Sequence, residues 1–146
     1  MIHLRPFRPC DWQVLTKYQY IGIEQADAVK LIDEFNTPTY QGKFHRLLAI
    51  ANNEQIVGYV SLLETEDGTV SIGAEVYTPF QRQGYAYAAI LQLLTIANAH
   101  GYRTATAQVR KDNIASLALC KKLGFTVVNE AISRRGKPVY NLVMSI

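Results

Sequence analysis

The sequence predicts a single domain of the α+β class, in which helices flank a mostly antiparallel sheet. The chain has 146 residues, the usual size of one domain, and no linker, charge block or low-complexity tract divides residues 1–146. Strand-like alternation and helix-like spacing follow one another in the order β-α-α-β-β-β-α-β-α-β-β. With 49% hydrophobic and 18% charged residues, the chain can bury a sizeable core.

The first third of the chain predicts a strand and two helices. Residues 2–5 alternate in polarity like a short strand, and the prolines that follow end it before Asp11, a favourable helix cap. Helices are expected at residues 11–19 and 24–35, and residues 36–38 (Asn-Thr-Pro) stop the second one. Because both helices precede any long strand, we expect them to flank the sheet rather than to connect parallel strands.

Three successive strands come next. They are expected at residues 47–51, 56–64 and 69–77, and the turn residues at 52–53 and 66–68 separate them. Such short connections predict an antiparallel meander.

The second half of the chain alternates helices and strands. Apolar residues recur at helical spacing from Ala86 until Gly101 closes the helix. A second helix is expected from Asp112 to Lys122, with glycine just beyond it. The remaining strands are expected at residues 104–109, 125–129 and 139–146, the last two joined by a charged loop.

The turn at residues 81–86, between the last meander strand and the long helix, is the most informative stretch. It aims free backbone N–H groups and the positive end of the helix dipole at one point. Gly84 allows close approach of the backbone, Ala86 keeps the next turn slim, and Arg82 adds a positive charge. A diphosphate site and a helix that simply packs closely on a sheet both fit this turn taken alone.

Two motifs resemble the GNAT family of N-acetyltransferases over nearly the whole chain. The run from Gln81 to Ala86 fits the family's acetyl-CoA signature and directly follows Val76-Tyr77-Thr78-Pro79. The second motif runs from Asn113-Ile114-Ala115-Ser116 to Lys122-Leu123-Gly124-Phe125. Residues 4–12 and 72–76 further resemble the branch that contains the ribosomal-protein alanine N-acetyltransferases.

The resemblance implies a GNAT-like fold and acetyl-CoA as the cosubstrate. Its diphosphate would bind the main chain of residues 81–86, and its pantetheine arm would lie in a wedge where the strand ending at Val76 and the parallel strand 104–109 splay apart. Backbone groups near Val76 would polarise the thioester carbonyl. Asn113 would face the cofactor, although a helix cap fits it equally well. The implied cofactor-binding residues are Val76, Tyr77, Gln81, Arg82, Gln83, Gly84, Tyr85, Ala86, Asn113 and Ser116.

Glu75 is the candidate general base. Strand alternation puts its side chain on the face opposite Ile72, Ala74 and Val76. If that face lines a substrate cleft, partial burial should raise the pKa of Glu75 and make it a better base. A surface glutamate on a half-buried strand is the alternative interpretation.

The general acid is where the sequence departs from the family. Many relatives carry a tyrosine at the position of Cys120, in the motif that ends Lys-Leu-Gly-Phe. A thiol could protonate the leaving thiolate, but a small buried packing residue explains Cys120 better. Solvent or another tyrosine, with Tyr140 and Tyr77 the best placed, is the alternative donor.

Composition limits the partners. The net charge of +3 suits an anionic cofactor and falls short of the basic stripe of a duplex binder, so nucleic acid is not expected. Two cysteines without metal-ligand spacing, no signal peptide and no membrane-length apolar run predict a cytoplasmic protein without metal. The acceptor, a small-molecule amine or a protein N-terminus, is left open, and a homodimer is possible because relatives often pair.

The leading hypothesis is therefore an acetyl-CoA-dependent N-acetyltransferase that moves acetyl directly to a primary amine in a ternary complex. The alternative is an acyl-CoA-binding sensor with weak catalysis, which the missing tyrosine favours. An unrelated nucleotide-binding module is a third hypothesis, against which the absence of a Walker lysine motif and of a dinucleotide glycine fingerprint counts.

Overall fold

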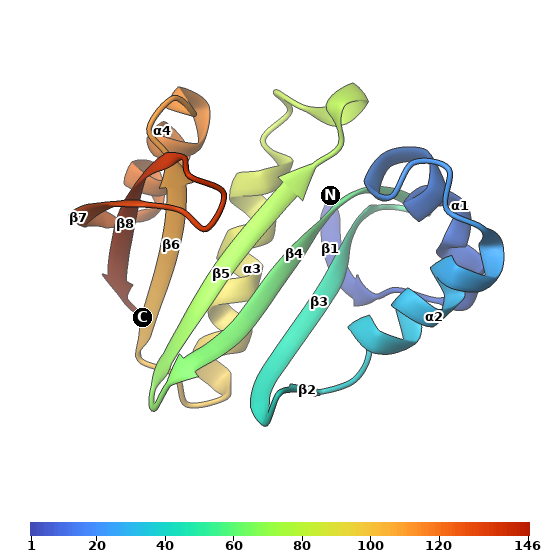
Figure 1. The fold of residues 1–146 in the computed structure, drawn as a ribbon, viewed down its shortest axis with the longest axis horizontal. Coiled ribbons are helices and arrows are strands. Elements are labelled where there is room, and N and C mark those ends of the chain that lie inside the picture. Colours follow the sequence, from blue (N-terminus) through green and yellow to red (C-terminus); the bar gives the residue numbers. More distant parts are fainter.

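One twisted sheet with helices on both faces forms the domain (Figure 1). The computed structural model describes all of residues 1–146. Its strands are β1 (Ile2–Pro6), β2 (Thr39–Tyr40), β3 (Lys43–Asn52), β4 (Gln55–Glu66), β5 (Thr69–Val76), β6 (Thr104–Arg110), β7 (Thr126–Ile132) and β8 (Pro138–Ser145). The strand order is β1-β3-β4-β5-β6-β8-β7, with β2 paired to β3. Only β5 and β6 run parallel, so the expected mixed, mostly antiparallel sheet is confirmed.

The helices differ from the expectation mainly at the start of the chain. The helical segment expected at 11–19 is confirmed, but it is not one regular α-helix: a 3-10 turn, one α turn and a π-helical turn follow one another. The π turn ends where Tyr20 N–H donates to the carbonyl of Leu15, a wider spacing than in an α-helix. No helix of the chain is both long and apolar enough to cross a membrane. The helical elements are η1 (Pro9–Asp11), α1 (Trp12–Val14), η2 (Leu15–Gln19), α2 (Gln25–Phe35), η3 (Thr78–Phe80), α3 (Tyr85–Ala99) and α4 (Ile114–Leu123).

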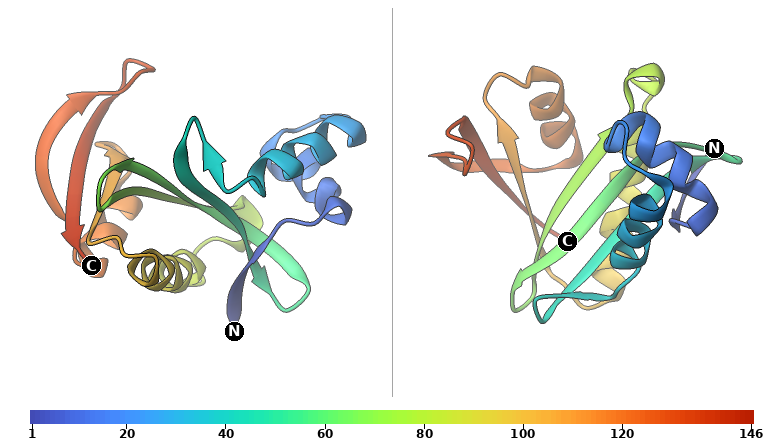
Figure 2. Two further views of the ribbon diagram at one scale, coloured as in Figure 1. Left: turned by 90° about the horizontal axis from the view of Figure 1, so that it is seen from below. Right: turned by 45° about the vertical axis from the view of Figure 1, so that its right-hand side comes forward.

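Two hydrophobic cores lie on opposite faces of the sheet. The larger one packs α3 and α4 against β3–β6, and Leu93 and Val60 are fully buried in it. The smaller one lies under α1 and α2 and includes Phe7, Leu15 and Ile32. Figure 2 shows α3 on one side of the sheet and α1–α2 on the other. The expectation that the early helices flank the sheet is therefore confirmed.

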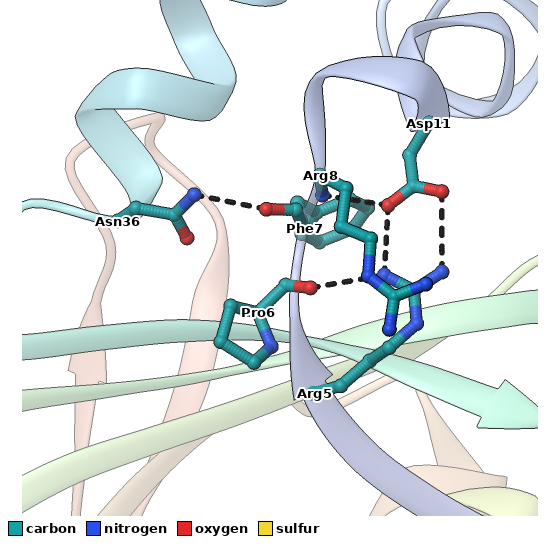
Figure 3. Close-up of polar contacts among 6 residues, drawn as sticks. All are labelled: Arg5, Pro6, Phe7, Arg8, Asp11 and Asn36. Atoms are coloured by element: carbon teal, nitrogen blue, oxygen red, sulfur yellow. Dashed lines mark hydrogen bonds and ion pairs between the residues drawn. The ribbon is translucent and has the colours of Figure 1, made fainter.

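A polar cluster connects η1 and the end of α2 to β1 and the residues that follow it (Figure 3). The guanidinium of Arg5 donates to both carboxylate oxygens of Asp11, at 2.8 and 3.1 Å, and the backbone N–H of Arg8 donates to the same carboxylate at 2.7 Å. Asn36, just after α2, donates its amide to the carbonyl of Phe7 at 2.9 Å. Burial alone would raise the pKa of Asp11, but the hydrogen bonds from Arg5 and Arg8 outweigh it and lower that pKa.

The parallel pairing of β5 with β6 is short. Only residues 69–71 of β5 pair with residues 104–106 of β6, whereas β6 pairs with β8 along its whole length. Beyond Ser71 the two strands separate, and β5 continues to Val76 with β4 as its only partner. The sheet therefore opens into a wedge that ends beside the start of α3 (Figure 1).

Candidate active site

The turn at residues 81–86 enters α3 through left-handed backbone. Arg82 has φ 66° and Gly84 has φ 79°, a conformation that costs a non-glycine residue energy and curls successive N–H groups towards one side. Tyr85 braces the turn, because its hydroxyl donates to Gln83 at 3.1 Å and accepts from Asn52 of β3 at 3.0 Å. The turn is thus fixed to the sheet rather than loose.

The backbone N–H groups of residues 82–87 have no acceptor within the protein. The first helical hydrogen bond of α3 runs from Ala88 N–H to the carbonyl of Gly84, and no side chain caps the helix. A Cβ added to Gly84 would meet nothing within 4 Å. Four features therefore meet at this turn: open space beside Gly84, backbone N–H groups without acceptors, the positive end of the α3 dipole and the exposed Arg82. This combination suits an anion such as a diphosphate.

A cleft of about 130 Å³ fills the wedge between β5 and β6. Its walls are mostly apolar, so it suits a slender, largely uncharged chain. The lining residues are Ile72, Gly73 and Ala74 of β5, Ala107, Gln108 and Val109 of β6, Ile90 of α3, Ser116, Leu119 and Cys120 of α4, and Phe125. The residues present fit coenzyme A: its diphosphate would lie at the turn, and its pantetheine arm would lie in this cleft.

The backbone beside Val76 is partly engaged already. The side-chain amide of Gln81 donates to the carbonyl of Val76 at 2.9 Å, and Tyr77 N–H donates to the carbonyl of Val57 at 2.8 Å. Gly58 allows the backbone of β4 to lie close to the backbone of β5 at this point, because a Cβ on residue 58 would lie 2.0 Å from the carbonyl oxygen of Glu75.

Asn113 and Ser116 sit at the start of α4. Asn113 is the N-cap, and its side-chain oxygen accepts from Ser116 N–H at 3.1 Å. The cap interpretation of Asn113 is therefore confirmed. Ser116 and Cys120 line the cleft, whereas Asn113 is exposed and does not.

Glu75 lies on the face of the sheet opposite the buried Ile72, but its expected partial burial is not found, because the side chain is exposed. Tyr59, its partner across β4 and β5, donates its hydroxyl to Oε2 of Glu75 at 2.8 Å. No motif pointed to Tyr59. Its signal lay in the register, which places residue 59 opposite residue 75 only once the meander is aligned.

The three candidate proton donors lie in different places. Cys120 is buried in the cleft wall, and burial raises the pKa of its thiol. Tyr77 is buried under α1–α2, stacks on Tyr18 with ring centroids 4.8 Å apart, and donates its hydroxyl to Gln19 at 2.8 Å. Tyr140 of β8 pairs with the cleft-lining Val109, and its hydroxyl makes no hydrogen bond within the protein.

No group of three or more His, Cys, Asp or Glu side chains is placed to hold a metal ion.

An anion-suited turn beside a cleft in a split sheet, with helices on both faces, defines the architecture of an acetyltransferase. Residues 2–126 match the acetyltransferase (GNAT) domain family. The chain therefore belongs to this family.

Solved structures of similar fold support the architecture. RimL, a ribosomal L7/L12 α-N-protein acetyltransferase in complex with coenzyme A, is 20% identical with a TM-score of 0.85, covering 99% of this chain and 94% of RimL. A chimera of the spermidine N-acetyltransferase SpeG from Vibrio cholerae and hSSAT is 13% identical with a TM-score of 0.80, over 98% of this chain and 95% of that one.

A third structure holds the cosubstrate. The microcin C7 self-immunity acetyltransferase MccE, in complex with acetyl-CoA and AMP, is 20% identical with a TM-score of 0.79, over 99% of this chain and 92% of that one. At these identities the likeness shows the fold alone, and the ribosomal-protein acetyltransferase RimL is among the proteins that share it. By sequence the chain matches no curated protein significantly.

Proposed function

We propose that the protein transfers acetyl from acetyl-CoA directly to a primary amine, in a ternary complex of protein, cosubstrate and acceptor. The observation that carries this proposal is the run of N–H groups at residues 82–87 without acceptors, directly beside the cleft. When bound, acetyl-CoA supplies an activated thioester. The turn holds its diphosphate, and the cleft walls exclude water from its arm.

Glu75 is proposed to accept the proton of the attacking amine. Its carboxylate is exposed on the open face of β5, where an amine from solvent reaches it, and Tyr59 fixes its position. Contact between the amine and the Glu75 carboxylate requires no movement of the sheet. The base therefore lies on the strand that also forms one wall of the cleft.

Tyr140 is proposed to protonate the leaving thiolate. The Cys120 side chain is short and buried, and an S–H group is a weak hydrogen-bond donor, so Cys120 is a poor donor to a coenzyme A thiolate. The hydroxyl of Tyr77 is committed to Gln19. Tyr140 is the remaining candidate, with a free hydroxyl beside the cleft strand β6.

The experiment is incubation with acetyl-CoA and a panel of amines that includes amino acids, polyamines, amino sugars and N-terminal peptides, followed by release of free thiol. We expect thiol release with at least one class of acceptor. Tight binding of acetyl-CoA without transfer to any acceptor would point to the acyl-CoA sensor, which the cysteine at position 120 favours. Absence of both binding and transfer would refute the proposal.

A further inference from the structure

A hollow of about 420 Å³ opens at the tip of the β7–β8 hairpin. Five residues line it, and only one of them is hydrophobic. They are Gln108, Ile132, Ser133, Arg134 and Arg135. The hollow is therefore polar and basic, unlike the apolar cleft between β5 and β6.

Gln108 connects the two cavities, because it lines both the hollow and the cleft. Its side chain is exposed, whereas its neighbour Val109 is buried, so residue 108 faces away from the larger core. Its amide donates to Asn141 of β8 at 3.1 Å, which holds it in place. Figures 1 and 2 show the hairpin tip on the side of the sheet away from α3, the side that also carries α1 and α2.

The arginines of the hollow have no carboxylate partner. The ion pairs of the chain are Arg5–Asp11, Arg110–Asp112 and Lys111–Glu130, so the acid nearest along the hairpin, Glu130, is already paired. Arg134 and Arg135 are exposed and make no hydrogen bond within the protein. Two guanidinium groups are thus available for an external anion.

The hairpin tip presents these arginines on a closed turn. Ser133 N–H donates to the carbonyl of Lys137 at 2.8 Å, and Gly136 N–H donates to the carbonyl of Ser133 at 2.8 Å. Lys137 N–H in turn donates to the hydroxyl of Ser133 at 3.1 Å. These three hydrogen bonds order the five residues before a ligand binds. Binding therefore costs less conformational entropy than it would on a free loop.

We propose that this hollow selects the acceptor, and that the acceptor is a primary amine carrying a carboxylate close to its nitrogen. The inference rests on the proposed function. Arginine binds carboxylates through paired, charge-assisted hydrogen bonds. Glu75, on the same side of the sheet, attracts the ammonium end, so the two ends of such a molecule meet opposite charges. A polyamine such as spermidine would meet repulsion from Arg134 and Arg135.

The carboxylate has two sources, which paired probes separate. One pair is β-alanine and its amide, in which the carboxylate belongs to the small molecule itself. The other is the tripeptide amide Ala-Glu-Ala and its Ala-Gln-Ala counterpart, in which it belongs to a side chain near a peptide N-terminus. Binding of each probe, and of spermidine, is measured by calorimetry with and without coenzyme A, and transfer is measured separately.

We expect the carboxylate member of at least one pair to bind about tenfold more tightly than its amide. The pair that shows the preference identifies the source of the carboxylate. In the double variant Arg134→Gln, Arg135→Gln the preference should disappear, while the affinity for coenzyme A stays unchanged. Lys137→Gln is the matched control, because it removes a cation from the same turn that does not line the hollow, and it should keep the preference.

Equal binding within both pairs would overturn the inference, as would spermidine binding as tightly as the carboxylate probes. Equal loss of preference in Lys137→Gln would also overturn it, because the effect would then be one of net charge. The proposed function fails by a different result, namely no transfer of acetyl to any amine. The titrations without coenzyme A still measure the carboxylate preference in that case.

Discussion

The phenol of Tyr59 on β4 donates a 2.8 Å hydrogen bond to Oε2 of Glu75, its register partner on β5. Burial and this hydrogen bond both raise the pKa of Tyr59, so the phenol stays protonated and remains a donor across the neutral range. The carboxylate is otherwise exposed to solvent. An acidic side chain on an open sheet face is thus held at one fixed point beside the cleft.

Removing the Glu75 carboxylate should strongly slow transfer. We expect Glu75→Gln to lower kcat/KM by about 100-fold or more, because general base catalysis typically contributes that much. Tyr59→Phe should lower kcat by about tenfold with an unchanged KM for acetyl-CoA, because the carboxylate is then free to rotate. Glu66→Gln, an exposed glutamate further along β4, serves as the control. Unchanged turnover of Glu75→Gln across the pH range would remove Glu75 from the mechanism.

Cys120 and Tyr140 should separate packing from proton donation. Cys120→Ala is expected to leave kcat within about twofold of the wild type and to lower the free energy of unfolding by about 1 kcal/mol, because a small buried side chain is lost. Tyr140→Phe should lower kcat by about tenfold or more without a comparable loss of stability. A large drop in kcat for Cys120→Ala, with normal turnover of Tyr140→Phe, would reverse the assignment.

Gly84 and Gly101 provide a matched pair at the two ends of α3. Both have positive φ, 79° and 92°, and a Cβ at either would meet nothing within 4 Å. An alanine at either position should cost about 1 kcal/mol of stability, through backbone strain. Only Gly84→Ala should also weaken acetyl-CoA binding, by about tenfold, because its Cβ enters the space proposed for the diphosphate. Equal affinities in a calorimetric titration of the two variants would show that the turn does not hold it.

Asp11 should make stability depend on pH in the acid range. Its pKa is lowered in the folded state, so its contribution is fully present above the unfolded value of about 3.9 and is lost as the pH falls through the folded value. We expect Asp11→Asn to cost about 2 kcal/mol at pH 7, and the difference from the wild type to close below about pH 4. Urea unfolding between pH 7 and 2 measures it. Asp67→Asn, at an exposed turn, should show no such trend.

The sequence predicted the long elements well, because each carried its own periodicity and its own stop signal. The meander, α3 and α4 lie within a few residues of the expected ranges. The strand β2 was missed, since two exposed residues show no alternation. The π turn at Leu15–Gln19 was missed because its hydrogen bonds follow from packing, including the stack of Tyr18 on Tyr77, and not from local propensity.

The site was predictable where backbone conformation makes it and less so where distant side chains meet. Gly84 indicated a turn before the long helix. In the structure Gly84 is the N-cap of α3, and a Cβ on it would meet nothing within 4 Å. The exposure of Glu75 could not be read from alternation, which gives the face of a strand but not what covers it. Gly58 and Gln108 carried no local signal, because their roles come from contacts with other segments of the folded chain, β5 for Gly58 and the β7–β8 hairpin for Gln108.

The brevity of the β5–β6 pairing has a mechanical consequence. The sheet consists of two antiparallel blocks, one ending at β5 and the other beginning at β6, joined by a pairing that spans only residues 69–71 and 104–106. A ligand in the cleft contacts both blocks, so its binding stabilises the association of one block with the other. At a concentration 100 times its Kd it adds about 2.7 kcal/mol to the free energy of unfolding. The resistance of the protein to proteolysis in a cell would then rise and fall with the supply of the proposed cosubstrate.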